Sequence, residues 1–282
     1  MNQDVLASYE NPSRNQGKPD AAAPREPSIG QPDAGEENRS RNFVYLLLLL
    51  ALCGSLYLLK AGSNPLSDPD EARCGLIVRE MITSGDWIAP RLGGKLYSDK
   101  PAPFFWLAAL GTEITGNAEL GGRLFPALSG VLTILITYLL ARGLFNARIA
   151  LLAGLMLGTG AEFIYVARWY RMDMPFVAAM WAAIWWFWRC EKQRMAHPQN
   201  KSPWQWYGFY FFCAIATAFK GPAGAGLPGL VILAYLLLMG RPRRLLGLLH
   251  PGAILLYFLV AAPWYVMMER HHPGDLSNFL VH

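Results

Sequence analysis

The sequence predicts an all-α, polytopic transmembrane protein. Of its 282 residues, 53% are hydrophobic and only 16% are charged, whereas a soluble domain typically carries about 25% charged residues. The hydrophobic residues also gather in long runs, as a chain that crosses a bilayer repeatedly requires. Because of these apolar runs, we expect membrane lipids to surround the chain. The net charge of +5 is modest and gives no indication of a nucleic-acid partner.

The N-terminal residues 1–42 are predicted to form a disordered cytoplasmic tail. They are rich in Pro, Asn, Gly and mixed charge, and such a segment cannot bury enough apolar surface to offset the entropy cost of ordering. This polar stretch is too long for a signal peptide, so we expect the first apolar run to remain as an anchor.

Residues 43–282 are predicted to form one membrane domain with about seven spans. The expected spans are Phe43–Leu59, Leu120–Leu140, Ile149–Val166, Met174–Trp188, Tyr207–Phe219, Ala223–Met239 and Gly252–Met268. The short connectors rich in Lys and Arg favour a cytoplasmic N-terminus. The connectors on that inner side contain a single acid, Glu191, so the polar active-site surface is expected on the outer side.

The longest polar interval, Asn64–Pro103, lies in the outer loop of residues 61–119, which is predicted to be functional because long charged loops with Gly and Pro at their corners usually are. Asp68 is expected to cap a helix with Pro69 in its first turn and Glu71 completing a capping box. Gly85 would end this helix. Pro101–Thr112 is expected to form a second helix, and both would lie along the membrane surface.

Four outer segments place charged side chains at one membrane level, and each has a structural and a functional interpretation. Helix capping, i,i+3 pairing, salt bridges and snorkelling lysines explain them without a ligand. A shared pocket for a phosphate-bearing lipid explains them together. The residues concerned are Asp70 and Arg73, Asp99 and Lys100, Arg168, Arg171 and Asp173, and Lys220.

Cysteine and histidine give weaker signals. The four cysteines show neither a disulfide framework nor metal-ligand spacing. His271, His272 and His282 follow the last predicted span, where solvated side chains and a metal role both remain open.

The order of the motifs resembles a known family over residues 43–282. The motifs are Asp70-Glu71-Ala72-Arg73, Arg79-Glu80-Met81, Gly85-Asp86-Trp87, Pro90-Arg91, Tyr97-x-x-Lys100-Pro101, Gly122-Arg123-Leu124, Arg168-x-x-Arg171-x-Asp173, Lys220-Gly221-Pro222 and Ala262-Pro263-Trp264. They are similar to those of the bacterial 4-amino-4-deoxy-L-arabinose transferases, GT-C glycosyltransferases related to protein O-mannosyltransferases.

This resemblance implies a polyprenyl-phosphate-linked sugar donor and a lipid A-like or other periplasmic acceptor at the bacterial inner membrane. By position it implies catalytic roles for Asp70 and Asp173. The residues implied at the donor phosphate are Arg73, Lys100, Arg171 and Lys220.

The resemblance also allows a divalent metal, with Asp99 and His282 at the places of metal ligands. Asp99 stands where the family usually has Glu. Family members continue beyond the length of this chain, so we expect a truncated chain, a fragment or a half that needs a partner.

Two other function classes remain open from the sequence. A non-catalytic binding or structural subunit would carry the same motif residues. A transporter of anionic lipid or solute would place charges deep within its spans, and only Glu162 lies inside an apolar run.

Overall fold

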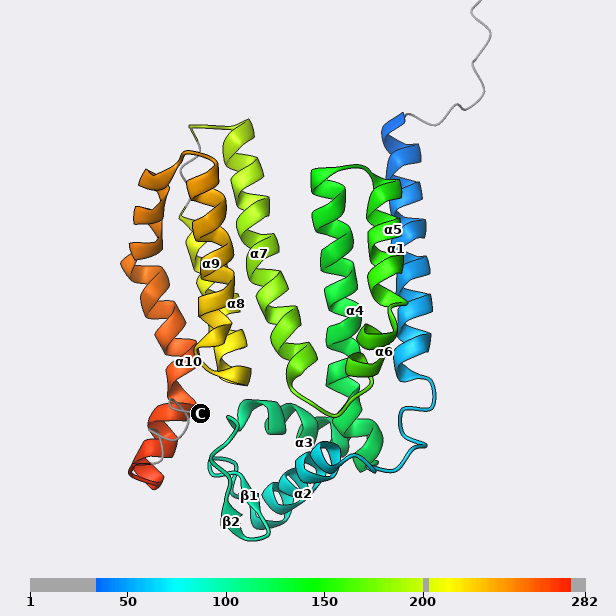
Figure 1. Ribbon diagram of the computed structural model, residues 1–282, viewed down its shortest axis with the longest axis vertical. Helices are drawn as coiled ribbons and strands as arrows, with labels where there is room; N and C mark the ends of the chain where they lie inside the picture. Colours follow the sequence, from blue (N-terminus) through cyan, green and yellow to red (C-terminus); the bar gives the residue numbers. More distant parts are fainter. Residues whose placement is uncertain (1–33, 200–202, 275–282) are drawn as a thin grey trace, which may run out of the picture. The chain divides into compact units, whose positions relative to one another are not determined.

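The computed structural model describes residues 34–199 and 203–274, which are helical apart from one small hairpin (Figure 1). The elements are α1 (Ala34–Leu58), α2 (Pro69–Ser84), β1 (Arg91–Leu92), β2 (Lys95–Leu96), α3 (Pro103–Thr115), α4 (Ala118–Leu144), α5 (Ala147–Gly158), α6 (Ala161–Ala167), α7 (Asp173–Ala196), α8 (Trp204–Lys220), α9 (Ala223–Leu238), the 3₁₀ helix η1 (Pro242–Leu249) and α10 (Pro251–His271). The chain separates into two units, Met1–Ser40 and Arg41–His282, and the cores and the candidate site lie in the second.

Each of the seven predicted spans is covered by helix. Within the described residues, three helices are long and apolar enough to cross a membrane by themselves: Arg39–Leu58 of α1, α4 and α10. The pair α5 and α6 is a fourth candidate, and α9 is a shorter apolar helix. The chain is therefore a polytopic helical membrane protein, as predicted.

One predicted span is wrong in shape. The segment Ile149–Val166 is not a single straight helix, because α5 and α6 are bent by 67°. Gly160 has an extended backbone and becomes the N-cap of α6. The carbonyl of Gly158 accepts a hydrogen bond of 2.8 Å from the buried Tyr57 hydroxyl of α1, which satisfies a backbone group at the break.

Part of the predicted N-terminal tail is helical. Residues 1–33 of the predicted tail lie outside the described residues, but residues 34–42 belong to α1. A helix nucleated in the apolar span extends backwards readily, because each further residue adds a hydrogen bond without a new nucleation cost. Asn42 is buried and accepts a hydrogen bond of 3.0 Å from the Tyr138 hydroxyl of α4.

The helices of the second unit share three hydrophobic clusters. One joins α1, α4, α5 and α6, and another joins α7, α8, α9 and α10. The third joins α2, the hairpin and α3 to the adjacent ends of α7, α8 and α10. Figure 1 shows α2, α3 and the hairpin gathered across one end of the long helices. This arrangement brings the predicted functional loop against the helix ends.

The end signals of α2 are confirmed, but its capping box is wrong. Asp68 is the N-cap and accepts a hydrogen bond of 2.9 Å from the Asp70 amide, while Gly85 closes the helix with φ of 71°. Glu71 does not reach back to the cap. Its buried carboxylate binds Arg123 of α4 instead, because a guanidinium removed from water offers a stronger, charge-assisted partner.

Candidate functional site

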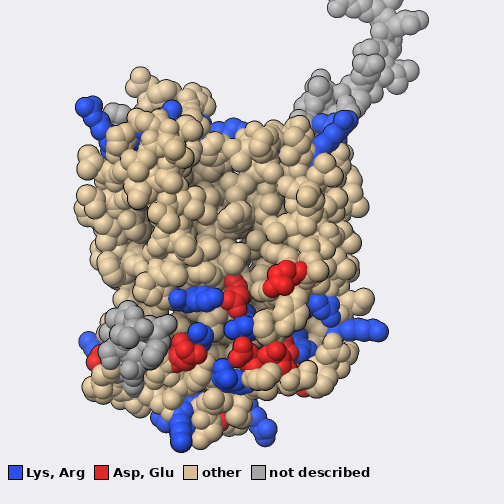
Figure 2. Space-filling model, viewed as in Figure 1, with Lys and Arg blue, Asp and Glu red and all other residues tan. Residues whose placement is uncertain are grey.

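Ten residues from α2, the segment between β2 and α3, the start of α7 and the end of α8 line a cavity of about 180 Å³. They are Asp70, Arg73, Cys74, Tyr97, Asp99, Lys100, Arg171, Met172, Asp173 and Lys220. All six residues predicted at the catalytic centre or the donor phosphate are among them. Figure 2 shows acidic and basic side chains together at this end of the molecule.

Asp70 lies in the first turn of α2, where the cap at Asp68 fixes the start of the helix. Its carboxylate is 3.0 Å from Nη1 of Arg73 and 3.2 Å from Nη2 of Arg171. The predicted i,i+3 pair with Arg73 is thus confirmed. The second contact joins α2 to the segment before α7, which are about 100 residues apart in sequence.

Asp173, the first residue of α7, orders two cations. Its carboxylate lies 2.6 Å from Nζ of Lys220 and 3.5 Å from Nε of Arg171. Arg171 therefore bridges Asp70 and Asp173, and its guanidinium also stacks over Trp169 at 4.4 Å from the ring centre. Lys220 is the last residue of α8, so the two helix ends meet at this ion pair.

Arg168 does not join this cluster. Its guanidinium donates to the backbone carbonyls of Leu56 and Leu59 at the end of α1. Arg168 thus fixes the end of one helix, and only Arg171 lines the cavity.

Asp99 and Lys100 close the cavity from the side of α3. The Asp99 carboxylate accepts a hydrogen bond of 3.0 Å from the Tyr97 hydroxyl and lies 3.7 Å from Nζ of Lys100. Burial raises the pKa of Tyr97 above its ordinary value, so the phenol stays a donor. Burial likewise raises the pKa of Cys74 to about 12, which keeps its thiol neutral.

The predicted metal ligands do not form a site in the part of the chain that is described. His282 lies outside it. Among the described residues no three His, Cys, Asp or Glu side chains come together to hold a metal ion, and the Asp99 carboxylate is engaged by Tyr97 and Lys100. A metal at Asp99 stays a prediction.

A second cavity of about 320 Å³ shares Asp99, Lys100 and Lys220 with the first. It continues along apolar side chains of α7, α9 and α10, which are Phe176, Leu227 and Tyr265. A molecule with a charged head and an apolar chain could therefore contact both cavities at once.

Sequence reasoning missed the buried ion pair beneath the site. Arg123 and Glu71 are each 5% exposed, with contacts of 2.9 Å from Nε and 2.6 Å from Nη2 to the carboxylate. Glu71 also accepts from the Tyr170 amide at 2.9 Å. The pair holds the neighbours of Asp70 and Arg171 in place. The sequence offered one sign of this pair, because Arg123 is a charged residue near the start of the apolar run that forms α4.

Comparisons with known proteins agree with this architecture. Residues 99–267 match the sequence profile of the family described as dolichyl-phosphate-mannose-protein mannosyltransferase. The undecaprenyl phosphate-alpha-4-amino-4-deoxy-L-arabinose arabinosyl transferase 2 of Pseudomonas fluorescens is 31% identical over 247 residues, which cover 84% of this chain and 40% of that protein. The corresponding transferase of Pseudomonas aeruginosa is 31% identical over 251 residues, covering 86% and 44%.

A solved structure is similar as well. The crystal structure of ArnT from Cupriavidus metallidurans bound to undecaprenyl phosphate superposes with a TM-score of 0.74 at 27% identity, over 85% of this chain and 44% of that one. The chain thus spans less than half the length of these relatives. The predicted all-α, polytopic fold class is confirmed.

Proposed function

Because the chain belongs to the dolichyl-phosphate-mannose-protein mannosyltransferase family of GT-C glycosyltransferases, we propose that it transfers a sugar from a polyprenyl phosphate to an acceptor at the membrane surface. The observation that carries the proposal is the charged cavity at the helix ends. Four basic and three acidic side chains line it, which leaves one net positive charge for an anionic ligand.

The donor phosphate is assigned to the boundary between the two cavities. Lys100 and Lys220 line both, so their ammonium groups would contact the phosphate while the prenyl chain follows Phe176 and Leu227. Undecaprenyl phosphate, which the similar crystal structure contains, has this combination of an anionic head and an apolar chain. Arg73 and Arg171 would add positive charge on the side of Asp70.

The proposed reaction is an inverting transfer. An acceptor oxygen attacks the anomeric carbon, the bond to the phosphate oxygen breaks, and its electron pair leaves with the lipid phosphate. Stabilising this developing anion is the main electrostatic demand, which the two lysines and Arg73 would meet.

The role proposed for Asp70 depends on the acceptor. If the acceptor is a hydroxyl, Asp70 takes its proton as general base. If the acceptor is a phosphate such as that of lipid A, it is already an anion, and Asp70 orients it or stabilises positive charge on the sugar ring. Asp173 is proposed to position Arg171 and Lys220, both of which it contacts.

We further propose that the site faces the periplasm of a bacterial inner membrane and that the N-terminus is cytoplasmic. The uneven distribution of acids supports this orientation, since they gather with the site in Figure 2. No specific observation favours a transporter. The buried charged side chains among the described residues are Glu71, Arg123 and Glu191, and each lies near a helix end.

Donor binding by the 282-residue chain in lipid nanodiscs tests the proposal. Labelled polyprenyl-phosphate sugar should bind, and Lys100→Ala should weaken binding about tenfold or more, because a charge-assisted hydrogen bond contributes about 1.5–3 kcal/mol. Lys95→Ala is the matched control, since Lys95 is an exposed lysine of β2, close to Lys100 in sequence but outside both cavities.

Turnover distinguishes a transferase from a binding subunit. Asp70→Asn should abolish sugar transfer to an added acceptor while donor binding persists. Donor binding without turnover in the unsubstituted chain would support the binding subunit. Equal binding by the Lys100 and Lys95 variants would overturn the proposed donor site.

A further inference from the structure

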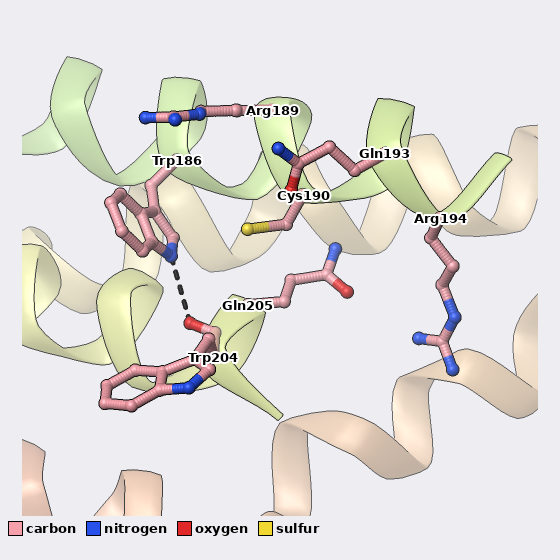
Figure 3. Close-up of a pocket in the computed structure, with 7 residues that line it drawn as sticks. All are labelled: Trp186, Arg189, Cys190, Gln193, Arg194, Trp204 and Gln205. Atoms are coloured by element: carbon pink, nitrogen blue, oxygen red, sulfur yellow. Dashed lines mark hydrogen bonds between the residues drawn. The ribbon is translucent and has the colours of Figure 1, made fainter. Parts of the chain in front are cut away.

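A separate basic cavity, of about 300 Å³, lies between the last turns of α7 and the first turn of α8. Its lining residues are Trp186, Arg189, Cys190, Gln193, Arg194, Trp204 and Gln205. Figure 3 shows the Cys190 thiol and the Gln205 side chain between the two helices, with Arg189 and Arg194 toward opposite ends. Arg189 follows Asp173 by 16 residues of one helix, about 24 Å along its axis, so this cavity is separate from the candidate active site.

Glu191, which follows the lining residue Cys190 in the sequence, is already paired with two arginines. Glu191 is fully buried, and its carboxylate is 2.9 Å from Nη1 of Arg241 and in contact with Nη1 of Arg244. Gln205 accepts a hydrogen bond of 2.9 Å from the same Arg244. Two arginines of the η1 region thus neutralise the charge of Glu191, and these buried ion pairs hold α7 against that region.

Arg194 lies in the electrostatic field of Glu191 and Arg244, and Arg189 is exposed. Neither makes an ion pair with an acidic side chain in the described ranges, and Arg189 instead stacks near Trp185 at 5.6 Å from the ring centre. Figure 2 shows Lys and Arg but no acidic side chain at this end of the visible face. Two guanidinium groups without a salt bridge in the described residues therefore lie beside one cavity, where both would stabilise a bound anion.

We propose that this cavity binds the phosphodiester headgroup of an anionic phospholipid, in the leaflet opposite the candidate active site. Guanidinium groups bind phosphate oxygens in a bidentate manner, and the exposed Gln193 amide offers a partner for a glycerol headgroup. Trp186, whose indole donates a 3.0 Å hydrogen bond to the Trp204 carbonyl, supplies the interfacial aromatic surface typical of this membrane depth. The apolar ring faces of Trp186 and Trp204 would contact the first carbons of an acyl chain.

Cys190 provides a reporter inside the cavity. It is partly exposed, whereas Cys53, Cys74 and Cys213 are buried. The chain would be placed in nanodiscs of phosphatidylcholine alone or with phosphatidylglycerol, and the alkylation rate of Cys190 by a polar maleimide would be followed by peptide mass spectrometry. Phosphatidylglycerol should slow the alkylation of Cys190 and leave the rates of the buried cysteines unchanged.

Substitutions separate this site from general surface charge. Arg189→Gln and Arg194→Gln should each weaken the protection by phosphatidylglycerol about fivefold, since one basic residue near an anionic membrane contributes about 1 kcal/mol. Arg148→Gln is the matched control, because Arg148 is an exposed arginine in the first turn of α5, outside the cavity. Its protection should match that of the unsubstituted chain.

Three outcomes would overturn the proposal. Equal protection of Cys190 by phosphatidylglycerol in all three arginine variants would show that general surface charge, and not this cavity, attracts the lipid. Absence of protection by phosphatidylglycerol would show that no such headgroup occupies the cavity. Full protection by soluble glycerol phosphate in phosphatidylcholine nanodiscs would assign the cavity to a free phosphate instead of a lipid.

Discussion

Removing the guanidinium of Arg123 should destabilise the protein more than any exposed charge change at the site. Arg123→Met leaves the Glu71 carboxylate, 5% exposed, with the Tyr170 amide as its remaining described donor. It also strips Arg123 hydrogen bonds from the carbonyls of Ala61 and Asn64, both 2.7 Å. An unpaired buried charge of this kind costs about 3–5 kcal/mol.

Equilibrium unfolding in mixed detergent or lipid micelles, followed by Trp fluorescence, would measure the loss. Arg73→Met is the matched control, since its pair with Asp70 is 42% exposed on the arginine side and such pairs contribute about 0.2–1 kcal/mol. Arg123→Lys should fall between the two, because one ammonium group cannot replace the guanidinium fork.

A double-mutant cycle completes this test. Glu71→Gln in the Arg123→Met background should cost less than Glu71→Gln alone, because no unpaired charge then remains. A loss below about 1 kcal/mol for Arg123→Met, or strict additivity in the cycle, would refute the assignment of this pair as the anchor of the site.

Two further predictions concern packing and pH. Gly111→Ala should destabilise the protein by about 1–3 kcal/mol, because the added Cβ would overlap the backbone of Gly121 where α3 meets α4. Gly226→Ala is the control, since a Cβ at Gly226 would have no atom within 4 Å. Equal stability of the two variants in thermal unfolding would contradict the close approach of α3 and α4. Cys74, with its pKa raised to about 12 by burial, should remain a protonated thiol from neutral pH to about pH 10, because a thiol is neutral at pH values below its pKa. Alkylation of Cys74 at pH 8 as fast as that of a free cysteine would contradict this protonation state.

The helical segments were readable from the sequence because burial in a membrane requires long uninterrupted apolar runs. Asp68 and Gly85 marked the ends of α2 correctly, since capping depends on residues adjacent in the chain. The break between α5 and α6 was not readable. It depends on the approach of Tyr57 to the Gly158 carbonyl, a contact between residues 101 positions apart.

The candidate site shows the same division. The ordered motifs indicated which charges belong to one site, including Asp70, Asp173 and Lys220. Their mutual distances were not predictable, because each ion pair joins different helices whose ends meet only after packing. The capping-box prediction for Glu71 failed for this reason, since a local rule competes with a distant partner, Arg123, that the sequence places 52 residues away.

The sequence by itself thus determined the membrane class, the helical segments and the set of residues that carry charge at one level. Hydrophobic length and local capping suffice for the membrane class and the helical segments, because they act over one or a few helical turns. The order of the motifs indicated the charged residues. Only the tertiary structure decided which charges neutralise one another: Glu71 with Arg123, Asp173 with Lys220, and Glu191 with two arginines. It thereby decided which cations remain for ligands, because electrostatic pairing follows distance in space and not position along the chain.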